Sequence, residues 1–281
     1  MFKDSRSLEI SCYVLCAGAF SIFARWMQLQ LAYNDDDLPD SSVWNVLVPL
    51  LILAGAFIFY RFLKKSKEAG FTLSGDLFEA LRNNGTAYTV VRWIIGAALI
   101  AGSALLFLES STDRNVVFLR VLSVLGVLTG LCFPLLLSCA NRPHAVKQST
   151  TTLLSLIPIL FFSVWLLTSY KRNSINPVRW DFVIEILALI VCMEASFRIA
   201  GFAYGVPSTG KSMFFSMLSA MLCMMCIADE RMLGESVMFG ASALMFVMLN
   251  WVMVSNFKKE EKPIIPAVEV VVDDGGLERL K

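Results

Sequence analysis

The chain has 281 residues, of which 57% are hydrophobic and only 17% are charged, and its mean hydropathy is +0.66. Water-soluble globular chains are about 45–50% apolar and about 25% charged, so this composition excludes an ordinary soluble domain. The net charge is +1, which excludes the strongly basic character of proteins that bind nucleic acids. The excess of apolar residues indicates a chain that lies in lipid.

The apolar residues occur in eight runs, and each run approaches or exceeds the roughly 20 residues that a transmembrane helix needs. In chain order the runs are 8–29, 43–63, 87–108, 115–138, 151–169, 181–203, 212–229 and 235–256. We therefore expect an all-α, polytopic integral membrane helix bundle. Residues 1–257 form its single transmembrane domain, and residues 258–281 form a tail.

The basic residues in the connections predict which way the bundle is inserted. If the N-terminus is cytoplasmic, the cytoplasmic segments carry thirteen basic residues, namely Lys3, Arg6, Arg61, Lys64, Lys65, Lys67, Arg82, Arg142, Lys147, Lys211, Lys258, Lys259 and Lys262. The exterior loops then carry five, namely Arg114, Lys171, Arg172, Arg179 and Arg231. Because Lys and Arg accumulate on the cytoplasmic side, both termini are predicted to be cytoplasmic, in the plasma membrane.

The connection after the second run contains a short amphipathic stretch at residues 75–83. Leu77, Phe78 and Leu81 share one face of a helix there, so we expect an interfacial helix that lies flat on the inner leaflet. The tail that begins at Lys258 is charged and then extended, and we expect either a loosely ordered segment or one docked strand.

Small residues in two neighbouring runs predict close contacts between helices. Ala98 and Gly102 are four residues apart in the third run, and Gly126 and Gly130 have the same spacing in the fourth. Such pairs let two helix backbones approach each other in a membrane. Three runs also contain an internal proline that predicts a kink, namely Pro49, Pro134 and Pro158.

Charged residues inside the runs are the main candidates for a functional site. Each of them costs about 2.5–3.5 kcal/mol at the centre of a membrane helix, so each needs a partner or water. By depth they form two layers. The outer layer consists of Arg25, Arg120 and Glu185, and the inner layer consists of Arg92, Glu194 and Arg198.

The inner layer predicts a polar site. Glu194 and Arg198 are four residues apart with the acid first, which is the favourable order for an ion pair on a helix. Arg92 lies at a similar depth and would leave a net positive charge that attracts an anion. We predict that the pair faces the interior and lines a cavity open to the cytoplasm. The alternative is that these charges only hold helices together or reach the headgroups.

The octapeptide from Gly205 to Ser212 reads GVPSTGKS and matches the loop that cradles nucleotide phosphates. That loop works between a strand and a helix of an α/β domain. Here it joins two predicted spans, and no stretch of the chain could build such a domain. We interpret the match as coincidental, and the octapeptide as a turn.

Sulfur-containing side chains gather near the end of the chain. Met213, Met217, Met221 and Met224 fall within a narrow arc of one helix, with Cys223 at its edge. Thioethers and thiols select Cu(I), but methionine is also a common apolar gap-filler. We expect packing, with no metal and no other cofactor.

Three classes of function are compatible with these features. A small-solute transporter or permease-type subunit accounts for charge layers in the membrane, and its partners are the lipid bilayer and an anionic small solute. A non-catalytic scaffold or accessory subunit, bound to a partner membrane subunit, accounts for the same charges if they are structural. An enzyme ranks third, because the sequence contains no recognisable set of catalytic residues.

Overall fold

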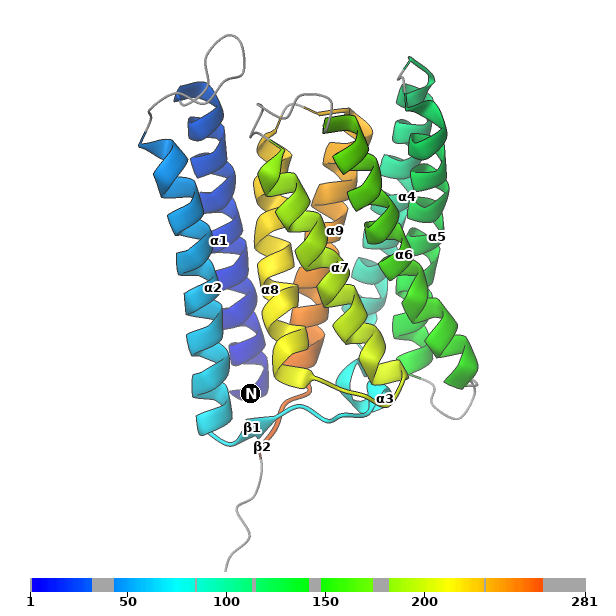
Figure 1. Ribbon diagram of the computed structural model, residues 1–281. Coiled ribbons are helices and arrows are strands. Elements are labelled where there is room, and N and C mark those ends of the chain that lie inside the picture. Colours follow the sequence, from blue (N-terminus) through cyan, green and yellow to red (C-terminus); the bar gives the residue numbers. More distant parts are fainter. Residues whose placement is uncertain are drawn as a thin grey trace, which may run out of the picture.

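The computed structural model describes residues 2–31, 43–83, 85–112, 115–141, 148–173, 182–229 and 231–259. In this part of the chain the fold is almost entirely helical, and the long helices stand side by side as one bundle (Figure 1). These helices are α1 (Phe2–Leu31), α2 (Trp44–Glu68), α4 (Thr86–Glu109), α5 (Val116–Ala140), α6 (Gln148–Asn173), α7 (Val183–Ala203), α8 (Thr209–Met225) and α9 (Leu233–Ser255).

Seven of these helices are long and apolar enough to cross a membrane, which confirms a multi-pass membrane protein. The seven are α1, α2, α4, α5, α6, α9 and α8 together with the 3-10 helix Cys226–Ala228 that continues it. The helix α7 corresponds to the remaining predicted span. It is 21 residues long, contains three charged residues and packs between α6 and α8.

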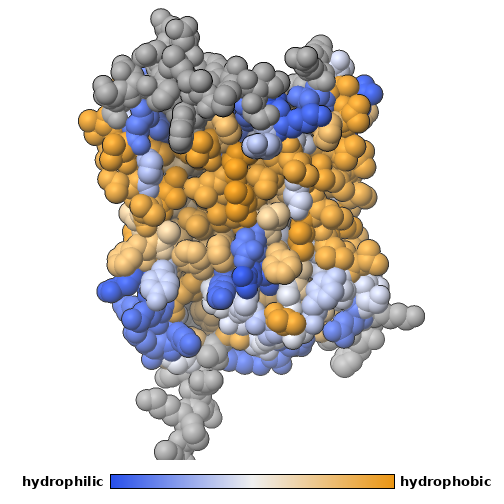
Figure 2. Space-filling model, in the orientation of Figure 1, coloured by the Kyte–Doolittle hydropathy of each residue, from blue (hydrophilic) through white to orange (hydrophobic). Residues whose placement is uncertain are grey.

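The surface of the bundle agrees with a lipid environment. A broad hydrophobic band runs across the visible face, and hydrophilic residues gather above and below it (Figure 2). The N-terminus and the short strands β1 (Phe71–Thr72) and β2 (Lys258–Lys259) lie at the same end of the bundle (Figure 1). We call this end the inner end and the opposite end the outer end.

The helices α8 and α9 form the centre of the bundle. In each of them, 72% of an apolar stretch of 18 residues is buried inside the protein. The helix α4 packs against α5 and α9, while α6 and α7 pack against each other. The α1–α2 hairpin stands along one side of the bundle (Figure 1). Only 17% of the corresponding stretch of α2 is buried, so this helix is the least enclosed of the seven.

The small residues predicted to allow close contacts do so. A Cβ on Gly130 would lie 2.7 Å from the carbonyl oxygen of Gly96 and 2.8 Å from Ile100 Cγ1. A Cβ on Gly102 would lie 3.1 Å from the carbonyl oxygen of Gly234. The backbones of α4, α5 and α9 therefore approach closely because these positions have no side chain.

The predicted methionine arc of α8 faces the α1–α2 hairpin. The side chain of Met224 occupies the space over Gly18 of α1. Met221 does the same over Gly55 of α2, where a Cβ would lie 2.6 Å from its sulfur. The hairpin thus packs on the bundle through long, flexible side chains set into glycine gaps, as the packing interpretation predicts.

The predicted interfacial helix at residues 75–83 is shorter than expected, and it packs against the protein. The helix α3 covers only Leu77–Ala80, and Leu77 and Leu81 are buried against the protein. The amide of Asn256 donates to the carbonyl oxygens of Ala80 and Arg82. The apolar face of residues 75–83 is therefore covered largely by protein rather than by lipid headgroups.

The tail begins with a docked strand, which is one of the two alternatives predicted for it. Strand β2 pairs with β1 in antiparallel register, with Thr72 opposite Lys258. The ammonium of Lys258 lies 2.7 Å from a carboxylate oxygen of Glu79 and holds the pKa of that carboxyl below its usual value. The rest of the tail, residues 260–281, lies outside the described residues.

The contact between α4 and α5 predicts the effect of a single methyl group. Gly130→Ala places a Cβ against Gly96 and Ile100, so it should lower the free energy of unfolding by about 1–3 kcal/mol through overpacking. Denaturant titration of the purified protein in detergent measures this change. Gly240→Ala, also within a helix and with its nearest atom at 3.7 Å, is the matched control and should not destabilise. Equal stability of the two variants would contradict the close contact.

Candidate functional site

The outer end of the bundle contains a connected row of buried charges. Arg25 Nε of α1 donates to one carboxylate oxygen of Asp229 across 2.6 Å. The other oxygen of Asp229 accepts a hydrogen bond from Arg231 Nη2 across 2.5 Å. Arg231 Nη1 in turn forms an ion pair with Glu185 of α7. Four alternating charges thus join α1, the connection between α8 and α9, and α7.

These four side chains are withdrawn from the surface, with exposed fractions of 1% to 8%. Burial lowers the pKa of the Arg231 guanidinium, but the carboxylates of Glu185 and Asp229 outweigh that effect and leave the pKa above its usual value. Arg231 therefore stays charged, and its charge is balanced inside the protein. Removing one partner would leave an uncompensated buried charge.

A second, partly buried ion pair lies at the same end. Arg172, at the end of α6, donates from both Nη atoms to the two carboxylate oxygens of Glu235 in α9, across 2.7 and 2.9 Å. This two-pronged geometry is the strongest that an arginine makes with a carboxylate. Together with the row of four, the pair brings three arginines and three acids into the outer end. Their formal charges add to zero.

Two amides extend the charged row into the α1–α2 hairpin. Arg25 Nη1 donates to Gln28 Oε1 across 2.7 Å, and Gln28 Nε2 donates to Asn45 Oδ1 of α2 across 3.0 Å. These three side chains form the polar end of a cavity of about 500 Å³. Its other walls are apolar and come from α2 and α7, including Leu53 and Leu187.

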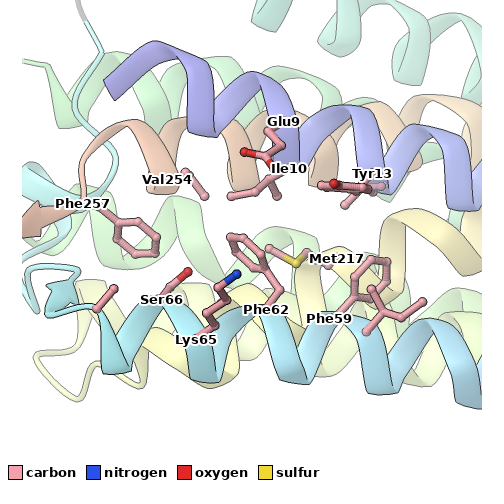
Figure 3. A pocket seen from close by; sticks show the side chains of 13 residues that line it. Glu9, Ile10, Tyr13, Phe59, Phe62, Lys65, Ser66, Met217, Val254 and Phe257 are labelled. Carbon is pink, nitrogen blue, oxygen red and sulfur yellow. The ribbon is translucent and has the colours of Figure 1, made fainter. Parts of the chain in front are cut away.

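A second cavity, of about 490 Å³, separates α1 from α2 at the inner end. Figure 3 shows Glu9 and Tyr13 on the α1 side and Phe62, Lys65 and Ser66 on the α2 side. Most of the walls are apolar, and the polar groups are near the inner end of the hairpin. The cavity is therefore amphipathic along its length.

A third cavity, of about 840 Å³, lies on the other side of α2. It shares Ser66 and Phe257 with the second cavity. Its charged lining residues are three lysines and one acid, namely Lys64, Lys67, Lys211 and Glu68. This balance favours an anionic group, and the remaining walls are mainly apolar.

The structure separates the three residues of the predicted inner site. Arg198 donates from Nε to Glu194 Oε1 across 2.7 Å, so the predicted pair forms on α7. Arg92 lies on α4, among residues of α4, α5 and α9, beside a cavity of only about 10 Å³. Its Nε is buried without a hydrogen-bond partner among the described residues. The structure does not bring Arg92 to the Glu194–Arg198 pair, because α7 packs against α6 and α8 and not against α4.

The pair also lies on a different face of α7 from the one predicted. Glu194 follows Ile190 and precedes Phe197 on one stripe of the helix, and these two neighbours are 42% and 58% exposed. The side chains of Glu194 and Arg198 are themselves 30% and 29% exposed. None of the three large cavities described above includes either residue. A hydrophilic patch is visible within the hydrophobic band over this part of the bundle (Figure 2).

Two of the three residues of the predicted outer layer meet in one cluster. Arg25 and Glu185 belong to the buried row, joined through Asp229 and Arg231. Arg120 lies apart, exposed on α5, with its guanidinium 5.3 Å from the centre of the Phe107 ring.

Asp229, Arg231, Glu235 and Arg172 were not among the predicted site residues, because they fall at the ends of predicted spans or in loops. A signal was present, however. The connection between the last two helices contains Asp229 and Arg231 and is too short to carry both charges away from the bundle. Charges in a tight connection at a helix end are drawn into the protein when complementary charges lie beside them.

The GVPSTGKS octapeptide begins as the end of a helix. Gly205 has a φ of +74°, and the amide of Val206 donates to the carbonyl oxygen of Gly201 across 2.9 Å. This is the Schellman arrangement that ends α7, and it requires a residue without a Cβ at Gly205. A helix rather than a strand precedes the loop, so the context for phosphate binding is missing.

No protein-family model matches this chain, and no curated protein or solved structure matches it either. A function for the protein therefore has to be inferred from its own residues and their geometry.

The outer cluster predicts a large loss of stability when one member is removed. Glu185→Ala leaves Arg231 with less compensation, so the free energy of unfolding should fall by about 3–5 kcal/mol, as measured by denaturant titration in detergent. Glu68→Ala is the control, because its pair with Lys64 is 3.9 Å apart and exposed. The control should change stability by less than about 1 kcal/mol. A loss of similar size in both variants would show that the buried row has no special role.

Proposed function

We propose that the protein is a permease-type membrane transporter for an amphiphilic anion, which moves along α2 between the hairpin and the rest of the bundle. The observation that carries this proposal is the position of the three cavities. Each one borders α2, and together their lining residues run from Asn45 at its outer end to Glu68 at its inner end.

The chemistry of the cavities supports an amphiphile. Their walls are mainly apolar, while the polar groups are concentrated at the two ends. Leu53 and Ile58 line cavities and are also 65% and 57% exposed, so the cavities open sideways toward lipid. Solutes that partition into the bilayer enter a protein by such lateral openings, and the lysines at the inner end favour a negatively charged headgroup.

The methionines of α8 supply the moving part of the proposed mechanism. The outer cavity reaches Leu53 and the inner cavity begins at Ile58, and Gly55 lies between them with Met221 packed onto it. We infer that this contact is the closed point of the pathway. A flexible thioether in a glycine gap can move aside at low cost, whereas a branched side chain cannot.

A flux assay tests the transport proposal. The purified protein in liposomes should speed the movement of fluorescently labelled phosphatidylglycerol between leaflets, followed by dithionite quenching, more than that of labelled phosphatidylcholine. Met221→Ala opens the closed point, and should raise the initial rate roughly tenfold if the barrier falls by about 1.4 kcal/mol.

The matched control for this variant is Met253→Ala in α9, which loses an equally buried side chain that lines none of the three cavities. Both variants should lose about 2–5 kcal/mol of stability, so only a change in flux separates them. Equal rates for the two variants, or no protein-dependent flux, would contradict the proposal.

We propose that the protein crosses the plasma membrane eight times, with α7 as the eighth span, and that both termini lie in the cytoplasm. The positive charge of the inner end supports this orientation, because Lys64, Lys65, Lys67 and Lys211 all lie there.

Cysteine accessibility tests the orientation. In a cysteine-free background, Asp36→Cys should react with a membrane-impermeant maleimide added to intact cells. Glu68→Cys, at the exposed inner end of α2, should react only after the cells are permeabilised. The reverse pattern would show that the bundle is inserted the other way.

A scaffold or accessory subunit is the second candidate. It is favoured by the outer cluster, whose three arginines and three acids are paired with one another and leave no net charge for a solute. This candidate would be supported if the protein bound a partner membrane subunit and produced no flux of either labelled lipid.

A further inference from the structure

We infer that the Glu194–Arg198 pair on α7 is the centre of an interface between two copies of this chain. This interface is independent of the transport pathway along α2.

The pair lies deep in the membrane in the eight-span arrangement proposed above. Glu194 precedes Ala203, the last residue of α7, by nine residues, or about 14 Å along a helix that rises 1.5 Å per residue. It follows Val183 by eleven residues. The carboxylate therefore lies near the middle of the helix, where an exposed charge is most costly.

Arg198 does not carry its charge to the inner headgroups. Its Nε donates to Glu194 Oε1 across 2.7 Å and its Nη2 lies 2.6 Å from the same oxygen, so the guanidinium points toward the middle of the helix. Helix geometry favours this direction, because side chains tilt toward the N-terminus and the N-terminal end of α7 is the outer end. The usual escape of an arginine near a membrane surface is thus not used.

The pair leaves polar atoms without partners. Both contacts from Arg198 end on the same oxygen, and neither Glu194 Oε2 nor Arg198 Nη1 has a hydrogen-bond partner among the residues that the structure describes. The pair is about 30% exposed between the exposed apolar side chains of Ile190 and Phe197. An ion pair against hydrocarbon is poorly solvated, so this stripe is stabilised when a polar partner covers it.

A second copy of the chain has the required charges at the required depth. Two copies inserted in the same direction are related by a twofold axis along the membrane normal, so their α7 helices run parallel at equal depth. Each Arg198 then lies one helical turn from the partner's Glu194, within reach of its long side chain. The two acids and two arginines form one neutral group, and Ile190 and Phe197 pack around it.

Charge reversal with rescue tests this interface. Wild-type protein, labelled with donor and acceptor dyes and reconstituted in liposomes over a range of protein-to-lipid ratios, should show energy transfer between copies. Glu194→Arg puts two arginines on each α7, and Arg198→Glu puts two acids there. Each variant alone should associate at least roughly tenfold more weakly, because like charges then face each other in the membrane.

Mixing the two variants should restore energy transfer, since two arginines on one copy then face two acids on the other. Leu128→Arg is the control, because it adds a charge at a lipid-exposed position of α5 at similar depth and should leave association unchanged. Restoration in the mixture also shows that both variants are folded.

Three results would overturn the inference. These are a wild-type protein that stays monomeric at every ratio, single variants that associate as well as the wild type, or a mixture of variants that is not restored. A different membrane protein bound at this stripe of a monomeric chain would overturn it as well.

Discussion

The outer end of this bundle depends on one requirement: charge that is buried in a membrane protein has to be neutralised within it. Arg25, Asp229, Arg231 and Glu185 meet that requirement as one alternating row, and Arg172 with Glu235 meets it as a two-pronged pair. In lipid, apolar helices gain little by packing against each other, so directional contacts of this kind decide which helices are neighbours. The row connects α1 to α7 through the α8–α9 connection, and the pair connects α6 to α9.

The inner half of the hairpin is held differently. Met221 lies over Gly55 in the middle of α2, Met224 lies over Gly18 of α1, and cavities lie on both sides of α2 toward the inner end. Thioether contacts are adaptable and undirected, while the ionic contacts at the outer end are specific. The hairpin is therefore anchored at one end and loosely packed along its length. That combination is compatible with the proposed movement of a solute along α2.

The chain thus deals with intramembrane charge in two ways. At the outer end, opposite charges from distant parts of the sequence are enclosed together. On α7, Glu194 and Arg198 satisfy each other only in part and remain on an exposed stripe. The first arrangement needs nothing outside the chain, while the second is more stable when another surface covers it. This difference separates the enclosed cluster from the interface that we propose on α7.

The sequence alone determined that the chain is a helical membrane bundle, because backbone groups in lipid must be satisfied within each segment and eight runs have the necessary length. It also determined the Glu194–Arg198 pair, since residues four apart on a helix are neighbours whatever surrounds them. The tertiary structure alone decided which face of α7 that pair occupies. Lipid and the protein interior are both apolar, so the hydrophobic pattern of a span does not reveal its buried face. It also decided that Asp229 and Arg231 join Arg25 and Glu185, because a contact such as that of Arg25 with Asp229, 204 positions apart, arises only when the helices pack.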